Sequence, residues 1–282
     1  MNMRKIAIAL MMLAASLLSG CFQVERVLTV KPDGSGVLEE TFMMSKKTLA
    51  MMNEAFGDKK NGKEQDTGLF KEEQLKSAAA RMGEGVSYMR GEKYATDDFE
   101  GYKAYYSVKD VNQLMIDSGP PKTDGKSEAV DPSKASRFVF IPGDTATLMI
   151  KSPKPKVPTK AEEKAEAAKP ATKAPETKPA VEPKKQPSQQ DMEMMKQMFD
   201  GMRVAFSVKV EGQIVETNAT HRLDDTVVLA DIDFGKLLNM APEELAKLNS
   251  IKEGDMTAAM AALKHLPGVK VDMHEEICIK FK

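Results

Sequence analysis

The chain has no tryptophan, only 6% aromatic residues and a formal net charge of −1. Without tryptophan and with few other aromatic rings, a platform on which bases or sugars stack is not expected. The near-neutral charge also lacks the basic signature of nucleic-acid-binding proteins. The composition therefore predicts no nucleic-acid partner, although 41% hydrophobic residues are enough for a folded core.

Catalytic motifs are missing as well. The chain contains no Gly-x-Ser-x-Gly nucleophile elbow, no phosphate-binding Gly-x-x-x-x-Gly-Lys-Ser/Thr loop and no dinucleotide-binding fingerprint. His274-Glu275-Glu276 lacks the second histidine of a His-Glu-x-x-His zinc site. Asp224-Asp225, Asp231 and Asp233 do not have calcium-loop spacing, so turn and helix-cap roles are expected for them. We predict that the protein is not an enzyme and has no resident metal or cofactor.

No hydrophobic run is long enough to cross a bilayer, because the apolar stretch at residues 6–18 is shorter than the ~20 residues of a transmembrane helix. This stretch follows Arg4 and Lys5 and ends in Leu18-Ser19-Gly20-Cys21. A basic start, an apolar segment and small residues at the end are the layout of a secretory signal peptide. We therefore predict a signal peptide at residues 1–20, cleaved between Gly20 and Cys21.

The sequence Leu18-Ser19-Gly20-Cys21 closely resembles the lipobox of bacterial lipoproteins. The resemblance implies a diacylglycerol thioether on Cys21 and an amino terminus acylated by a chain such as palmitate. An aspartate after the cysteine commonly keeps a Gram-negative lipoprotein in the inner membrane. Since Phe22 stands there instead, the resemblance implies the outer membrane, with the folded part facing the periplasm. The alternative is an ordinary signal peptide with an unmodified cysteine, although such signals favour an Ala-x-Ala-like end.

If Cys21 is acylated, Cys278 is the remaining thiol, and no intramolecular disulfide is expected. Cys278 alternates with Ile277, Ile279 and Phe281, which is the period of a β-strand. A nucleophilic cysteine needs a base and an electropositive environment, and His274 is four residues away along the strand. We expect an inert thiol, with a reactive or partner-linked one as the alternative.

A low-complexity segment at residues 153–190 divides the chain. It consists mostly of Lys, Pro, Ala and Glu without aromatic residues, and such a composition cannot bury enough apolar surface to fold. We predict a disordered linker here, either a solvated spacer or a segment that adheres weakly to an anionic polymer. Residues 21–152 and 191–282 then form two α+β halves. One split domain and two small domains both fit this division, and we favour the split domain because closing a long loop costs little.

Hairpins alternate with helices in both halves. Apolar residues at alternate positions predict strands at 24–31, 37–43, 86–94, 101–108, 137–141, 145–150, 203–210, 213–217, 226–232 and 276–281. Helical spacing and capping residues predict helices at 45–56, 69–82, 110–116, 189–202, 234–240, from 242 onward and at 254–265. This mixture predicts an α+β fold: an antiparallel, hairpin-rich sheet with packed helices, interrupted by the disordered segment.

Methionine is the most over-represented residue, at 21 copies, and several lie at helical intervals between residues 192 and 202. Met194, Met195, Met198 and Met202 are candidate partner-facing residues, because flexible thioether side chains adapt to varied surfaces. An ordinary apolar core face is the alternative. Thioethers also suit Cu(I), but a copper site needs ligands that converge from separate positions, so none is predicted.

The cysteine is followed by a strand, then by Lys31-Pro32-Asp33-Gly34-Ser35-Gly36 and a second strand. This arrangement resembles a group of bacterial outer-membrane lipoproteins, and the opening hairpin is similar to the LppM-type lipoprotein ectodomain. The resemblance implies a β-rich, membrane-proximal α+β domain and carries over no catalytic residues. We expect a lipid-anchored envelope protein with a structural or interaction role toward an envelope protein or lipid partner. The alternative is an envelope module that binds a lipophilic ligand.

Overall fold

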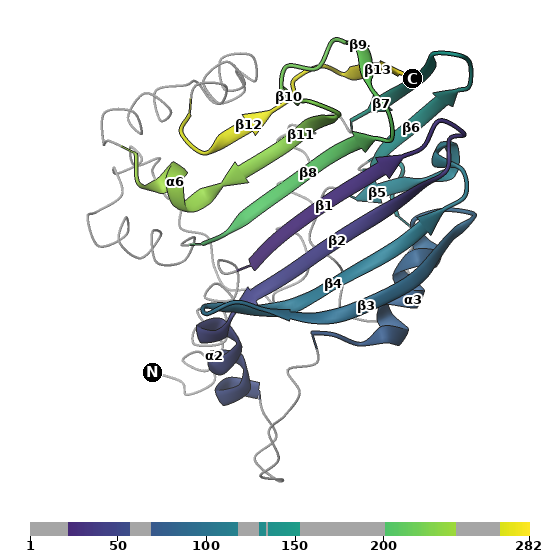
Figure 1. Cartoon of the computed structure of the whole chain (residues 1–282). Helices are drawn as coiled ribbons and strands as arrows, with labels where there is room; N and C mark the ends of the chain where they lie inside the picture. The colour runs from purple at the N-terminus through teal and green to yellow at the C-terminus, as the bar shows by residue number, and fades with distance from the viewer. Residues whose placement is uncertain (1–21, 57–68, 118–129, 134, 153–200, 241–265) are drawn as a thin grey trace, which may run out of the picture.

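Two packed β-sheets make up most of the structure, a computed structural model in which short helices lie at the margins (Figure 1). The structure describes residues 22–56, 69–117, 130–133, 135–152, 201–240 and 266–282. The predicted signal peptide and the linker at 153–190 lie outside these residues. So do residues 189–200 of the helix predicted at 189–202, the start of the helix predicted from 242 onward, and the helix predicted at 254–265.

The larger sheet has eight strands in the order β10-β11-β8-β1-β2-β4-β3, and β12 also pairs with β11. The pairs are antiparallel except for β1 and β8, which run parallel in the centre of the sheet. The strands are β1 (Phe22–Val30), β2 (Gly36–Ser45), β3 (Val86–Ala95), β4 (Phe99–Val108), β8 (Arg203–Val210), β10 (Arg222–Leu223), β11 (Thr226–Asp233) and β12 (Val269–Val271).

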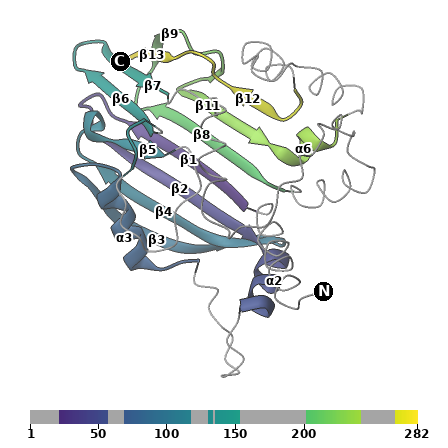
Figure 2. The same ribbon diagram turned by 180° about the vertical axis from the view of Figure 1, so that it is seen from behind.

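The smaller sheet has five strands in the order β5-β6-β7-β13-β9. They are β5 (Met115–Asp117), β6 (Ala135–Ile141), β7 (Ala146–Lys151), β9 (Ile214–Thr217) and β13 (Glu276–Phe281). Each sheet contains strands from before residue 152 and strands from after residue 202, so segments far apart in the sequence lie side by side (Figures 1 and 2). The predicted domain boundaries themselves stay a prediction.

Three α-helices are found in the described part of the chain: α2 (Lys46–Phe56), α3 (Glu72–Arg81) and α6 (Phe234–Leu238), with a short 3₁₀ helix, η1 (Val111–Gln113). The predicted α+β class with packed helices is therefore wrong, because strands dominate and one sheet packs against the other. Capping signals marked real helices, but those described are short and peripheral. Sheet-on-sheet contact supplies the core that the prediction assigned to helices.

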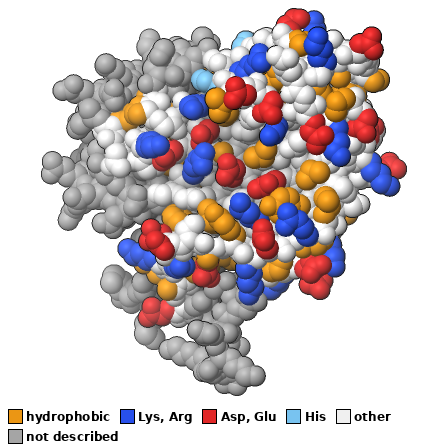
Figure 3. Space-filling view, in the orientation of Figure 1, with side chains coloured by type: hydrophobic (Ala, Val, Ile, Leu, Met, Phe, Trp, Pro, Cys, Tyr) orange, Lys and Arg blue, Asp and Glu red, His pale blue; other side chains and the backbone are white. Residues whose placement is uncertain are grey.

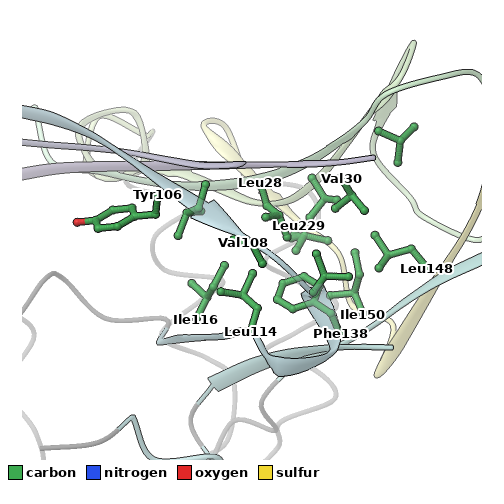
Figure 4. Close-up of a cluster of buried hydrophobic side chains, with 14 of the residues drawn as sticks. Leu28, Val30, Tyr106, Val108, Leu114, Ile116, Phe138, Leu148, Ile150 and Leu229 are labelled. Atoms are coloured by element: carbon green, nitrogen blue, oxygen red, sulfur yellow. The ribbon is translucent and has the colours of Figure 1, made fainter. Parts of the chain in front are cut away.

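The core lies between the two sheets, and Figure 4 shows one cluster of its buried side chains. Alternate residues of each strand point inward, and most of these inward residues are aliphatic or aromatic. The members that are 0% exposed include Leu28, Val30, Leu38, Tyr106, Leu148, Ile150, Val208, Ile277, Ile279 and Phe281. Leu28, Val30, Leu38, Tyr106 and Val208 of this list belong to the larger sheet. We call the part of its inward surface that they form the far half.

The rest of the inward surface, nearer to Phe22, we call the near half. It is formed by the inward residues Phe22, Val24, Arg26, Glu40, Phe42, Met44, Tyr102, Val204 and Phe206. Several of these are only half-buried, and two carry charge. The near half therefore differs in composition and burial from the far half of the same strands.

The opposite, outward surface of the larger sheet carries interspersed acidic, basic and apolar side chains (Figure 3). Long side chains there lie over neighbouring rings: the Arg90 guanidinium carbon is 3.8 Å from the Tyr105 ring centre, and Lys103 Nζ is 4.6 Å from that of Tyr94. Arg203 also forms an ion pair with Asp231 at 2.9 Å. This surface has the mixed character of a solvated sheet face.

Several local predictions are confirmed. The opening hairpin turns at Pro32-Asp33-Gly34-Ser35, where Gly34 has φ of +81° and a substituent Cβ would lie 2.6 Å from Phe140 Cδ1. Ser45 caps α2 by accepting a hydrogen bond from the Thr48 backbone N–H at 3.1 Å. Asp233 caps α6 in the same way, through the N–H of Lys236 at 3.0 Å. Asp and Ser thus hold both helix starts as their side-chain chemistry predicts.

Two local predictions are wrong. The short helix expected at 110–116 is only the 3₁₀ turn η1, followed by strand β5. The strands predicted at 203–210 and 213–217 indicate a hairpin that turns at Glu211-Gly212, but β8 and β9 belong to different sheets. Gly212, with φ of +142°, lies between them, and a Cβ there would lie 2.6 Å from the Lys282 carbonyl oxygen. The chain uses this glycine to cross from one sheet to the other instead of folding back.

Candidate functional site

The predicted site residues are only partly within the described structure. Gly20 and Cys21, the predicted cleavage and lipidation residues, lie outside it, as do Met194, Met195 and Met198. Met202 is described and is half-buried directly before β8. Because Gln23 of β1 is in register with Arg203 of β8, Met202 lies beside Phe22 at the margin where β1 begins.

We call this margin the Phe22 edge. It consists of the start of β1, the end of β2, the β3–β4 turn at 96–98, the start of β8 and the end of β11, with the helices α2 and α6 (Figure 1). The grouping follows from strand direction, since β1, β4 and β8 start where β2, β3 and β11 end. Phe22 is thus surrounded by segments from across the whole chain.

Specific hydrogen bonds fix this edge. Lys46, the first residue of α2, donates from its backbone N–H to the Asp98 carbonyl at 2.9 Å. Its ammonium group donates to the carbonyls of Thr96 at 2.7 Å and Asp97 at 3.0 Å. Helix α2 is therefore attached to the β3–β4 turn by three bonds from one residue.

A second set of bonds joins the start of β8 to its neighbours. Gln23 Nε2 donates to the Gly201 carbonyl at 3.1 Å, and the Phe234 N–H donates to the Met202 carbonyl at 3.0 Å. Gly201 has φ of +74°, and a Cβ there would lie 2.7 Å from Phe99 Cζ. Only glycine fits this position, which lets the Phe99 ring lie against the chain beside the start of β1.

The Phe22 edge also exposes apolar surface. The side chains of Phe22, Met44, Phe99 and Met202 are half-buried there. On α2 the exposed residues include Lys47, Ala50, Met51 and Glu54, which share one helical face, and Met51 is 51% exposed. A rigid edge with apolar groups and few lysines can contact a nonpolar or interfacial surface.

A buried ion pair occupies the near half, next to this edge. Arg26 Nε donates to Glu40 Oε2 at 2.7 Å, and their side chains are 9% and 1% exposed. Arg26 Nη1 donates to the Asp117 carbonyl at 2.6 Å, and the Tyr102 hydroxyl donates to Glu40 Oε1 at 3.0 Å. Both Glu40 oxygens are therefore hydrogen-bonded, which a buried carboxylate requires.

Two tyrosines flank Glu40 on β4, where Ala104 lies directly opposite the glutamate. Burial, and then the nearby Glu40 carboxylate, raise the pKa of Tyr102 and of Tyr106 far above the usual tyrosine value. Both therefore stay protonated and are poor bases or nucleophiles. Among the described residues, the Tyr106 hydroxyl finds no hydrogen-bond partner, although this residue is 0% exposed.

An Asp–His pair lies apart from Arg26, Glu40 and the two tyrosines. Asp272 Oδ1 is 2.6 Å from His274 Nδ1, the Asp272 side chain is 0% exposed, and that of His274 is 46% exposed. Burial acts to raise the pKa of Asp272, but hydrogen bonds from the backbone N–H groups of His274 and Thr220 outweigh it and lower the pKa. The pair ties the turn after β12 to the segment after β9.

The acidic residues considered for a cation have protein partners. Asp231 pairs with Arg203, Asp233 caps α6, and Asp225 accepts from Thr226 Oγ1 at 2.9 Å. Asp224 has φ of +51° in the turn before β11. Within the described residues, no group of three or more His, Cys, Asp or Glu side chains is arranged to hold a metal ion.

Sequence reasoning missed the row of Arg26, Glu40 and Tyr102. The available signal was strand parity: Arg26 alternates with Val24 and Leu28, and Glu40 with Leu38 and Phe42, so both charges are at inward positions. Charged residues in strands usually point to solvent, so burial of these two side chains was not predicted. The two residues also stand directly opposite each other once the hairpin register is known.

Comparison with known proteins adds one distant likeness. No family model matches the chain, and no curated protein matches it. Among solved structures, the NMR structure of the folded domain of LppM from Mycobacterium tuberculosis is similar, with a TM-score of 0.33 and 10% identity over 94% of this chain and 91% of that chain. Among the residues that the structure describes, no helix combines the length and the hydropathy that a membrane span requires.

Proposed function

We propose that the protein is a lipid-anchored bacterial envelope protein with a non-enzymatic structural or interaction role at the outer membrane. The observation that carries this proposal is that β1 begins at Phe22, directly after the lipobox cysteine. Cys21 is therefore joined by one peptide bond, with Cα atoms about 3.8 Å apart, to a central strand of the larger sheet. An acyl anchor at this position would hold a folded sheet against the membrane.

The anchor is tested by acylation of the full chain in bacterial cells. We expect an alkyne-bearing fatty acid to label the wild-type protein and a Cys278→Ser variant, and not a Cys21→Ser variant. The Cys278→Ser variant is the matched control, because it removes the other cysteine of the chain. An unlabelled wild-type protein whose amino terminus is a free Cys21 would contradict the proposal.

The membrane is tested by separating inner and outer membranes on a density gradient. We expect the wild type in the outer membrane and a Phe22→Asp variant in the inner membrane, since the aspartate supplies the retention signal. A Phe22→Ser variant removes the same ring without that signal and should stay in the outer membrane. Wild-type protein in the inner membrane would contradict the outer-membrane part of the proposal alone.

We also propose that Met194, Met195, Met198 and Met202 face an envelope protein or lipid partner. Support comes from the adaptability of methionine surfaces and from the place of Met202 beside Phe22. Crosslinking in cells should lose its adducts when Met194, Met195 and Met198 are replaced together by glutamine. A Met89→Gln variant, at a methionine of β3 that is 55% exposed, is the control and should leave the adducts unchanged. Adducts that survive the first replacement would contradict this proposal.

A second candidate function is a module that binds a lipophilic ligand, and one observation favours it. Val204 and Phe206 point inward from β8 next to Val24 and Arg26, yet both are only half-buried. An apolar surface beside buried polar groups is typical of sites for amphiphilic ligands. We expect lipid to copurify with the full chain in mild detergent and to decrease in a Phe206→Arg variant. A Val27→Arg variant, on the outward surface, is the control, and lipid-free wild-type protein would contradict this candidate.

A further inference from the structure

We infer that the Phe22 edge rests on the bilayer surface with the exposed face of α2 as a direct lipid contact, so that the strands of the larger sheet point away from the membrane. This inference rests on the proposed acylation of Cys21 and adds an orientation and a contact surface to it. The partner is the lipid surface itself, at the level of the headgroups and upper acyl chains.

The proposed anchor, Cys21, is bonded directly to the first residue of β1, without a tether between them. Phe22 pairs with Met44 in the ladder between β1 and β2, and the Gln23 side chain is bonded to the Gly201 carbonyl. A residue bonded to Phe22 can lie at most about 3.8 Å from its Cα, whereas a disordered tether would span roughly 5–6 Å times the square root of its length. Acyl chains on Cys21 therefore bring this edge, and no other surface, into the headgroup layer.

The second step is the rigidity of that edge. The three hydrogen bonds of Lys46 fix α2 to the β3–β4 turn, and Phe99 lies against Gly201 beside the start of β1. The bonds of Lys46 and the Ser45 cap determine where α2 begins relative to Phe22. When Phe22 is held at the surface, α2 is held there too (Figures 1 and 2).

The third step is the chemistry of the exposed groups. Met51 is 51% exposed on the same helical face as Lys47, and Phe22, Phe99 and Met202 are half-buried on the same edge. Apolar side chains near lysines suit the boundary between headgroups and acyl chains. The outward surface of the sheet, with its ion pairs and charged rows, would instead have to lose hydration to lie on lipid.

The fourth step concerns charge, which decides the type of lipid. Lys46 already donates to backbone carbonyls, and Lys236 pairs with Asp233 at 3.2 Å. The positive charge of Lys47 is balanced by Glu54 on the same helix face, and Asp97 and Asp98 add negative charge in the adjacent turn. The described edge has no net basic patch, so contact should come from apolar groups and should not require anionic lipid.

The chain offers a matched pair of positions for the test. Met51 is 51% exposed and Ile141 is 50% exposed, but they lie at opposite ends of the sheet. Ile141 follows Phe140, which lies against Gly34 in the β1–β2 turn, at the other end of β1 from Phe22. With nine residues in β1, the two ends of the strand are about 26 Å apart at ~3.3 Å per residue.

The experiment uses fluorescence, because the chain has no tryptophan of its own. Met51→Trp and Ile141→Trp variants of the full chain are acylated in cells, purified and placed in phosphatidylcholine vesicles with bromine on the upper acyl chain. Mass analysis of the amino-terminal peptide first confirms the acyl chains on each sample. We expect bromine to quench the Met51→Trp variant about twofold or more and the Ile141→Trp variant hardly at all. A Lys47→Trp variant, one turn earlier on the same face, should also be quenched.

The outcomes separate the two proposals. Equal, weak quenching at both positions of acylated protein would show that α2 does not contact the bilayer. This result would overturn the inference and leave the proposed anchor in place. Equal, strong quenching would mean that the molecule lies flat and would also overturn it. Quenching that requires added phosphatidylglycerol would overturn the apolar contact in favour of charge. An amino terminus without acyl chains would overturn the proposed anchor, and the inference with it.

Discussion

The near and far halves of the larger sheet belong to the same strands and differ in what covers them. In the far half the second sheet packs over aliphatic residues such as Leu28 and Val30, which are 0% exposed. The near half contains Arg26 and Val24, which precede Leu28 on β1 by two and four residues. Their neighbours on β8, Phe206 and Val204, are only half-buried. The far half is thus an apolar surface under the second sheet, whereas the near half combines buried residues with polar and partly exposed groups next to Phe22.

The largest expected effect comes from truncating one phenylalanine of the second sheet and one of the near half. Phe281→Ala removes a ring of β13 that is 0% exposed in the core between the sheets and should lower the free energy of unfolding by about 3–5 kcal/mol. Phe206→Ala removes a half-buried ring in the near half and should cost only about 1–2 kcal/mol. Urea denaturation of the purified protein measures both, and equal losses would remove the distinction between the core and the near half.

Removing one partner of the near-half ion pair should lower the free energy of unfolding strongly, whereas replacing both partners with apolar residues should lower it little. Glu40→Leu leaves the buried Arg26 guanidinium without its carboxylate and should cost about 3 kcal/mol. Replacing both residues, as Arg26→Met with Glu40→Leu, removes the desolvation penalty with the pair and should recover most of that loss. Chemical denaturation of the wild type, both single variants and the double variant forms the required cycle. A double variant no more stable than Glu40→Leu would show that the pair is needed for the fold.

A smaller effect separates the two tyrosines beside Glu40. Tyr102→Phe removes a hydroxyl that donates to Glu40 at 3.0 Å and should cost about 1–2 kcal/mol. Tyr106→Phe removes a buried hydroxyl that has no partner among the described residues, and should be neutral or slightly stabilising. The two residues are four apart on one face of β4, so each variant is the control for the other. A large loss in Tyr106→Phe would mean that its hydroxyl binds a ligand or water.

The smallest effect tests the link between the two sheets and depends on pH. The folded-state pKa of Asp272 is lowered, since its backbone hydrogen bonds outweigh the effect of burial. A group with a lowered folded pKa contributes stability above its unfolded pKa, about 3.9, and loses it as pH falls through the folded value. Asp272→Asn should therefore cost about 1 kcal/mol at pH 7, and the difference from wild type should shrink below about pH 4. A difference that is constant from pH 7 to pH 3 would contradict this account.

Local periodicity predicted most of the strands, because a half-buried strand shows its period in its own residues. Ile277, Ile279 and Phe281 alternate with Cys278 and Lys280, and the three apolar residues are all 0% exposed in β13. The helix caps at Ser45 and Asp233 were predictable for the same reason, since the capping side chain and the backbone N–H that donates to it are three residues apart. Such features need no knowledge of distant segments.

Sheet membership could not be predicted in this way. Alternation says that a strand has one apolar face and does not say which strand lies beside it. The residues 211–217 look like the second arm of a hairpin, but β9 pairs with β13 and leaves β8 to pair with β1. The fold class was wrong for this reason, because the core depends on strand partners far away in the sequence. The Arg26–Glu40 pair was missed because its burial depends on the same long-range packing.

The parallel pairing of β1 with β8 has a consequence for the order in which the molecule forms. Gln23 and Gly201, which are hydrogen-bonded across this pair, are 178 positions apart in the chain. A central pair with such a separation must close a very long loop, and contacts of this kind form slowly. The edge of β1 that faces β8 therefore stays unpaired until β8 has been synthesised. If Cys21 is processed as proposed, the signal peptidase would meet a strand whose sheet is still incomplete, and factors that shield exposed strand edges should then matter for this protein.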